Sequence, residues 1–170
     1  MTNIEKQLIM SYTFKKITKE EFLKRFPVDL TKENNYILSE LLRAFDTKDK
    51  DVILYAMMIL HLEYFTDRDK YVDIFNELLL VDWHDRHEDI ASLLKGISSS
   101  KSVDALFKAA TVQYDYLDYD DGYEFARKCI KALSSINNPE AIEKLRILSQ
   151  YHIPEIAAYA VKELKYKGLV

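Results

Sequence analysis

The feature that most constrains this chain is its scarcity of glycine and proline, with three of each in 170 residues. Sheet folds need many tight turns, and such turns usually consume Gly, Pro and Asn. Leu, Ile, Ala, Lys and Glu are frequent instead, and these residues are good or tolerable in helices. Hydrophobic residues make up 48% of the chain, which is enough for a continuous core. The sequence therefore predicts an all-α protein with short polar links.

Apolar residues recur at helical spacing over nearly the whole chain and predict about ten helices. These are expected at about 4–14, between 18 and 27, at 32–45, 52–65, 71–80, 84–95, 100–114 and 122–135, with two more that open at 139 and 154. Thr18 and Glu21 have the spacing of a capping box, and Asn138 before Pro139 fits an N-cap and first-turn pair. Gly96 is the expected C-terminal cap of the helix at 84–95.

Internal repetition in the second half indicates how the helices are arranged. At an offset of 39 residues, LLKGISSSKSVDALFKA matches ALSSINNPEAIEKLRIL, so that Leu94 falls on Leu133. At an offset of 31 residues, FARKCIKAL matches IAAYAVKEL, so that Cys129 falls on Ala160. Each unit is then two antiparallel helices within roughly 40 residues, the period of HEAT and armadillo repeats. Because one hairpin cannot bury its apolar face, we predict a HEAT-like α-solenoid of stacked antiparallel helical hairpins.

The links carry no signal of a domain boundary. None of them is rich in Gly, Ser or Pro, so the sequence predicts a single domain over 1–170. Residues 1–30 are expected to be N-terminal capping helices, and 31–170 the helical-hairpin repeats.

Charge is distributed unevenly along the chain. The net charge is +2 over 1–50, −10 over 51–124 and +4 over 125–170. The acidic middle disfavours nucleic acid as a partner, because nucleic-acid binders need Lys and Arg against the phosphates. It favours a cationic partner, whose approach such a field would accelerate. The alternative is a solvated helix surface without a binding role.

Several features predict a cytoplasmic protein with no membrane partner. Cys129 is the only cysteine, so no internal disulfide can form, and its match to Ala160 predicts a small buried packing residue. The first residues, MTNIEKQLIMSYTFKK, do not fit a signal peptide. The longest apolar run, 52–60, is far shorter than the roughly 20 residues that span a bilayer.

The segment at 82–89, DWHDRHED, is the densest polar stretch. On a helix, His84, His87 and Glu88 would lie on one face and could supply part of a zinc or iron site. A further strong ligand would have to come from elsewhere in the chain. One alternative is structural, with Trp83 as a core anchor and the histidines hydrogen-bonded to neighbouring loops. A second alternative is a solvent-exposed polar face that contacts a partner protein.

A second polar segment covers 114–124 and carries five acids, four tyrosines and no base. Tyrosine is enriched at interface hot spots, and carboxylates can accept hydrogen bonds from a partner's Lys or Arg. The alternative is a plain loop in which Asp120 or Asp121 caps the next helix, with Glu124 at the third helical position, while Leu117 packs inward.

Three segments together, WHDRHEDIASLL, YLDYDDGYEFARKCIKALSSI and PEAIEKL, resemble a group of small bacterial HEAT-like repeat proteins. In that group, Trp-His-x-x-His-Glu-Asp is followed by Tyr-Leu-x-Tyr-Asp-Asp and a Lys-Cys-Ile helix. The resemblance covers about 78–164. Its members look like immunity proteins, which are encoded beside polymorphic or contact-dependent toxins and neutralise them by binding. Lys131 departs from the pattern, in which an aromatic residue follows Cys-Ile.

We therefore expect a protein-binding immunity protein, without enzymatic activity, cofactor or bound metal, that occludes a cationic toxin domain. A nuclease is the leading candidate, because nuclease active sites are cationic. The chain shows no Gly-rich phosphate loop and no pairing of nucleophile and base. The alternatives are an enzyme or a metal- or cofactor-handling protein on the same scaffold, and a general adaptor. The expected partner-binding residues are Asp82, His84, His87, Glu88, Asp89, Asp115, Tyr116, Asp118, Tyr119, Asp120 and Asp121.

Overall fold

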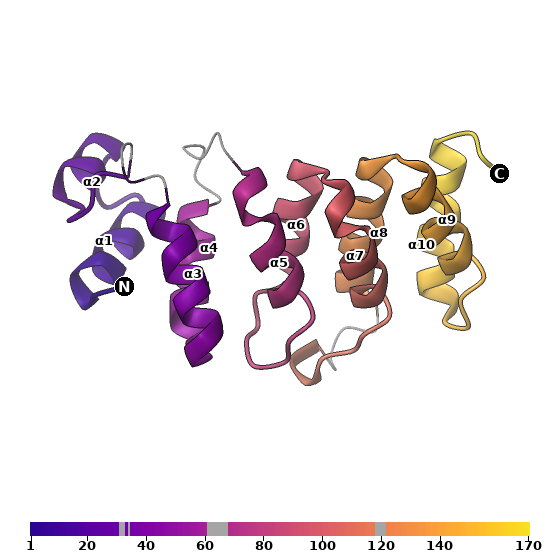
Figure 1. Cartoon of the computed structure of the whole chain (residues 1–170), viewed down its shortest axis with the longest axis horizontal. Coiled ribbons are helices and arrows are strands. Elements are labelled where there is room, and N and C mark those ends of the chain that lie inside the picture. Colours follow the sequence, from indigo (N-terminus) through magenta and orange to yellow (C-terminus); the bar gives the residue numbers. More distant parts are fainter. Residues whose placement is uncertain (31–32, 34, 61–67, 118–121) are drawn as a thin grey trace. The chain divides into compact units, whose positions relative to one another are not determined.

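The computed structural model describes residues 1–30, 33, 35–60, 68–117 and 122–170. Over these residues the protein is all-α, with ten α-helices, three short 3-10 turns and no strand (Figure 1). None of the described helices is long and apolar enough to cross a bilayer. Contacts group the chain into two compact units, Met1–Asp67 and Arg68–Val170. The single domain over 1–170 stays a prediction.

The first unit contains four helices: α1 (Asn3–Thr13), α2 (Lys19–Arg25), α3 (Tyr36–Thr47) and α4 (Lys50–Leu60). Helix α2 begins with the predicted capping box, in which the Thr18 hydroxyl accepts from the Glu21 amide and the Glu21 carboxylate accepts from the Thr18 amide. It ends before Pro27, as expected from the missing amide proton of proline. The predicted helix at 32–45 begins later, at Tyr36, and continues to Thr47.

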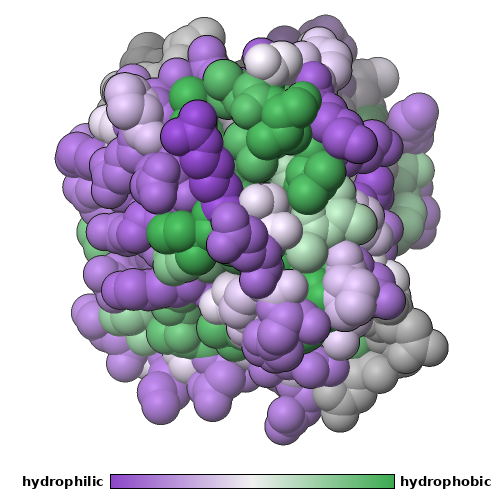
Figure 2. All heavy atoms as spheres, turned by 90° about the vertical axis from the view of Figure 1, so that its right-hand side faces the viewer, coloured by the Kyte–Doolittle hydropathy of each residue, from purple (hydrophilic) through white to green (hydrophobic). Residues whose placement is uncertain are grey.

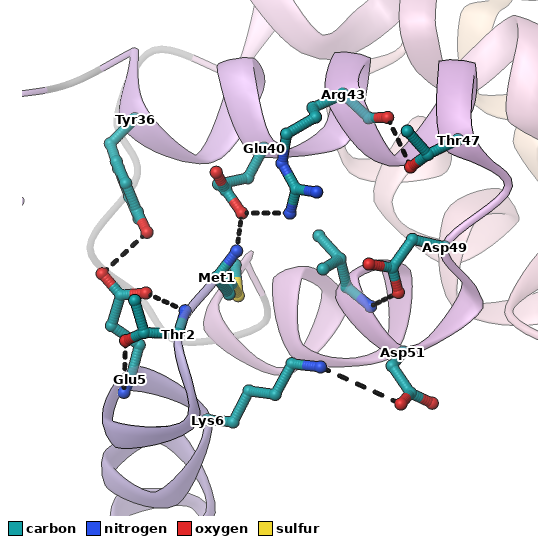
Figure 3. Close-up of polar contacts among 11 residues, drawn as sticks. Met1, Thr2, Glu5, Lys6, Tyr36, Glu40, Arg43, Thr47, Asp49 and Asp51 are labelled. Atoms are coloured by element: carbon teal, nitrogen blue, oxygen red, sulfur yellow. Dashed lines mark hydrogen bonds and ion pairs between the residues drawn. The ribbon is translucent and has the colours of Figure 1, made fainter.

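Two carboxylates join the start of α1 to α3 (Figure 3). The Tyr36 hydroxyl donates to Oε1 of Glu5 at 2.8 Å, and burial raises the pKa of Tyr36. Glu40 pairs with the α-ammonium group of Met1 and accepts from the Arg43 guanidinium at 2.9 Å. Hydrogen-bonded and paired charges therefore join the N-terminal end of α1 to α3.

The second unit forms two layers of helices. Its elements are η1 (Asp69–Tyr71), α5 (Val72–Leu78), α6 (His87–Ile97), η2 (Ser100–Ser102), α7 (Val103–Ala109), η3 (Asp115–Leu117), α8 (Glu124–Ile136), α9 (Pro139–Leu148) and α10 (Pro154–Tyr166). Helices α6, α8 and α10 pack side by side, and α5, α7 and α9 form the second row. Contacts between α5 and α6, α7 and α8, and α9 and α10 join the two rows. The end of the molecule that lies on the right of Figure 1 carries apolar side chains among polar ones (Figure 2).

Residues that match at the 39-residue offset of the sequence also occupy equivalent places in α6 and α8. Leu94 and Leu133 are both fully buried. Ser98 and Asn137 end α6 and α8 in the left-handed region, with φ of 57° and 53°. The same left-handed C-cap therefore recurs 39 residues apart, at the ends of α6 and α8.

Two predicted caps are wrong. Gly96 lies inside the last turn of α6, and Ser98 is the C-cap, where its hydroxyl donates to the Lys95 carbonyl at 2.8 Å. Helix α8 begins at Glu124 with Tyr123 as its N-cap, so Glu124 is the first helical residue and not the third. By contrast, Asn138 caps α9 as predicted.

Candidate functional site

The polar segment before α6 is not helical at its start. Because α6 begins at His87, His84 lies in the link between α5 and α6, and the predicted helix at 84–95 is wrong at its N-terminal end. The physical reason is a competing local hydrogen bond, since the Arg86 amide donates to Nδ1 of His84 at 3.1 Å. His84, His87 and Glu88 therefore do not share one helical face.

His84 and His87 form a stacked pair in the interior of the second unit. Their side chains are 3% and 0% exposed, and their ring centroids lie 4.2 Å apart. Nε2 of His84 donates to the Leu78 carbonyl at 2.9 Å. Nε2 of His87 donates to the Val81 carbonyl at 2.6 Å, and its Nδ1 accepts from the Tyr116 hydroxyl at 2.9 Å. A carbonyl can only accept, so each imidazole carries a proton on Nε2. The Arg86 amide donates to Nδ1 of His84, which makes that ring neutral, and the lowered pKa of His87 keeps it neutral as well.

Tyrosines from the link between α7 and α8 complete this cluster. The Tyr114 ring stacks on His87 at 3.9 Å, and its hydroxyl donates to the Leu79 carbonyl at 2.8 Å. Phe125, in the first turn of α8, packs edge-on to His87 with 5.7 Å between centroids. We call Trp83, His84, His87, Tyr114, Tyr116 and Phe125 the histidine–tyrosine cluster. It holds the α5–α6 link, the α7–α8 link and α8 together.

Burial sets the protonation of the cluster. It lowers the pKa of His84, and it lowers the pKa of His87 to about 4, with a further contribution from the neighbouring His84. It also raises the pKa of Tyr114 and of Tyr116. All four groups are therefore neutral near neutral pH, as expected for a stacked, desolvated cluster.

The hydrogen bonds of the cluster argue against a metal site at His84 and His87. A metal ligand must offer a ring lone pair, and on both His84 and His87 that lone pair already accepts a hydrogen bond. In the described part of the chain, no three His, Cys, Asp or Glu side chains are grouped so as to hold a metal ion. His61, one of the two other histidines of the chain that could supply the further ligand, lies outside the described residues. The histidines bond to backbone and side-chain groups of the neighbouring links, as the structural alternative expected. Trp83 is only half-buried and meets His84 edge-on, so it is not the core anchor which that alternative also expected.

The acidic residues around the cluster differ in exposure and in whether a basic side chain lies close to them. Asp82 and Asp115 are exposed. Asp89 is half-buried and lies 3.7 Å from the Arg86 guanidinium, and Glu88 is half-buried and lies 3.1 Å from Nζ of Lys128. The predicted residues Asp118, Tyr119, Asp120 and Asp121 lie outside the described residues.

Sequence reasoning missed the basic residues of this region. Arg86 bridges Asp85 and Asp89, a pattern that the spacing of three residues between Arg86 and Asp89 could have indicated. The pair of Glu88 and Lys128 joins α6 to α8 across 40 residues of sequence, and no local pattern predicts it.

Cys129 is fully buried, as predicted for a packing residue. Burial also raises the pKa of its thiol, which keeps it protonated and unreactive.

Comparison with known proteins identified no relative of the chain. No family model matches the chain, and neither a curated protein nor a solved structure matches it.

Proposed function

We propose that this protein binds another protein, in the manner of an immunity protein that occludes its cognate toxin, through an acidic surface at the α5–α6 and α7–α8 links. We call this surface the acidic link surface, and its described members are Asp82, Asp85, Glu88, Asp89, Asp115 and Tyr116. The observation that carries the proposal is the bond between His87 and Tyr116, which joins two links that lie 29 residues apart in sequence.

The histidine–tyrosine cluster makes this surface a preformed one. Binding is weakened when loops must be ordered, at roughly 0.5–1.5 kcal/mol for each immobilised side chain. His87 and Tyr114 anchor the links through bonds to the Val81 and Leu79 carbonyls, which removes much of that cost. The two histidines then act as supports beneath the surface, and the carboxylates around them are the groups that meet a partner.

The charge of the surface favours a cationic partner. Five carboxylates face two bases, Arg86 and Lys128, which leaves a net charge of −3. The exposed Asp82 and Asp115 can accept charge-assisted hydrogen bonds from Lys or Arg. A nuclease toxin offers such a cationic active site, and an immunity protein would meet it in the cytoplasm.

The scaffold supports this role as well. Two layers of helices and a sequence repeat of 39 residues are features of HEAT-like solenoids. Such solenoids present long surfaces to proteins. A general adaptor would use the same surface and differ only in the identity of its partner.

The experiment is co-expression with the toxin domain encoded beside the gene, followed by binding measurements with a double charge reversal, Asp82→Lys with Asp115→Lys. We expect the wild-type protein to neutralise the toxin and the double variant to bind at least about tenfold more weakly, because each reversal places like charges across the interface. Asp46→Lys, an exposed reversal in α3 of the first unit, is the matched control and should leave affinity within about twofold. Circular dichroism checks that all variants are folded.

Two results would contradict the proposal. One is that no neighbouring toxin forms a complex with the protein or is neutralised by it. The other is that the double reversal and the Asp46→Lys control bind equally well, which would place the interface elsewhere.

A further inference from the structure

A second polar surface lies at the C-terminal ends of α6, α8 and α10. It is an open groove of about 420 Å³, and three of its lining residues are Lys95, Lys131 and Lys167, one from or next to each helix. We call it the lysine groove. Glu163 is the only acidic side chain among its described lining residues.

The positive charges of the groove are only partly compensated. Nζ of Lys167 donates to Oδ1 of Asn137, a neutral group, at 2.7 Å. Over the described residues, neither Lys95 nor Lys131 has a carboxylate within ion-pair distance, in contrast to Lys128 one turn earlier in α8, which pairs with Glu88. The groove therefore gathers three like charges around one carboxylate, an arrangement that an anion would stabilise.

Compensation of the helix dipoles does not account for all three lysines. Cations in the last turn of a helix interact favourably with the helix dipole, and Lys95 occupies the last turn of α6. Lys131 differs, because the last turn of α8 carries no basic residue and Lys131 lies before it. Its half-buried side chain lines the groove instead. Lys131 is also the residue that departs from the aromatic expected after Cys-Ile.

We propose that the lysine groove binds a phosphate-type oxyanion, namely the chain of a di- or triphosphate. Lysine ammonium groups act as point charges and suit multiply charged tetrahedral phosphates, whereas planar carboxylates are recognised best by the arginine fork. No Arg lines the groove among the described residues. Tyr166 stands at its rim with 88% of its surface exposed, so a base could stack there if the phosphate belongs to a nucleotide.

The test is a titration of the full chain with inorganic pyrophosphate, followed by heteronuclear NMR at constant ionic strength set with NaCl. We expect saturable shifts of groove residues. The single variant Lys131→Gln should weaken binding about threefold to fivefold, as for one partly exposed charge pair. The triple variant at Lys95, Lys131 and Lys167 should abolish binding. Lys162→Gln, at an exposed lysine of α10 outside the groove, is the matched control and should bind as the wild type does.

A second arm identifies the source of the phosphate. If ATP binds more tightly than tripolyphosphate and Tyr166→Ala removes the difference, the ligand is a nucleotide; if the two bind equally, it is an inorganic phosphate chain. The proposal is overturned if pyrophosphate causes no saturable shift beyond that of chloride, or if the folded triple variant still binds it. Binding of single-stranded nucleic acid without binding of pyrophosphate would overturn it as well. None of these outcomes depends on a toxin partner.

Discussion

His87 places a neutral imidazole where the α5–α6 link, the α7–α8 link and α8 meet. Both of its ring nitrogens are hydrogen-bonded, and its two faces are covered by His84 and Tyr114. A proton on Nδ1 would remove the acceptor that Tyr116 uses, and would place a charge in a desolvated stack beside a second histidine. The folded protein therefore disfavours protonation at this residue, and the unfolded chain does not.

This difference predicts that acid destabilises the protein well above the pH at which carboxylates titrate. The pKa of His87 is about 4 in the folded protein, against about 6.5 for an unperturbed histidine. Between these values the unfolded chain binds more protons, so the free energy of unfolding falls as pH is lowered from about 6.5 toward 4. The loss from His87 amounts to about 3 kcal/mol, and His84 acts in the same direction. Urea unfolding at a series of pH values measures this loss in the free energy of unfolding.

The variant His87→Gln isolates the contribution of this residue. Its unfolding free energy should fall less steeply between pH 6.5 and 5, a window in which few carboxylates titrate, even if the variant is less stable at pH 7. His152→Gln, at an exposed position, controls for the loss of one histidine. An unchanged slope in His87→Gln would mean that the imidazole is accessible to protons in the folded protein.

The helices show how one side-chain bond moves a helix start. Asn138 accepts from the Ala141 amide at 2.7 Å, and α9 begins at once, at Pro139. Ser99, the residue 39 positions earlier, has the same extended backbone but makes no side-chain cap bond. There the chain forms the 3-10 turn Ser100–Ser102 first, and α7 begins only at Val103.

We therefore predict unequal effects of alanine at the two equivalent positions. Asn138→Ala should lower the free energy of unfolding by about 1 kcal/mol, because it leaves a helical amide without its acceptor. Ser99→Ala should change it by less than about 0.5 kcal/mol. Denaturant melts of both variants make the comparison, and equal losses would show that the cap bond contributes nothing.

At the scale of the whole molecule, each of the two compact units has buried apolar residues of its own. Leu41 is fully buried in the first unit, and Leu133 is fully buried in the second. Replacement of a fully buried leucine by alanine typically costs about 3–5 kcal/mol, because a cavity remains. Whether that cost is felt along the whole chain depends on whether the two units unfold together.

We predict that the two units respond separately. Leu41→Ala should reduce hydrogen-exchange protection in α1–α4 and leave α6 and α8 protected, while Leu133→Ala should do the reverse. Native-state hydrogen exchange with mass spectrometry resolves the two regions. A uniform loss of protection in either variant would instead support the single cooperative domain predicted from the composition of the links.

Much of the local structure follows from short-range patterns. The scarcity of Gly and Pro and the apolar periodicity predict an all-α chain, and neighbouring residues predict the caps that the structure shows at Thr18 and Asn138. The offset of 39 residues and the burial of Cys129 could also be read from the sequence. Helix starts and buried faces depend on residues a few positions apart, which is why local patterns reveal them.

The candidate sites required the packed structure. His84 and His87 looked like two members of a helical face, but the first is drawn into a link by contacts with Leu78 and Arg86. The bond from His87 to Tyr116 spans 29 residues. Lys131 joins Lys95 and Lys167 only because three helices pack side by side. The sparse glycines and prolines determine that this chain folds into helices. Which polar groups meet is decided by the packing of those helices, because such contacts depend on distances in space that sequence separation does not encode.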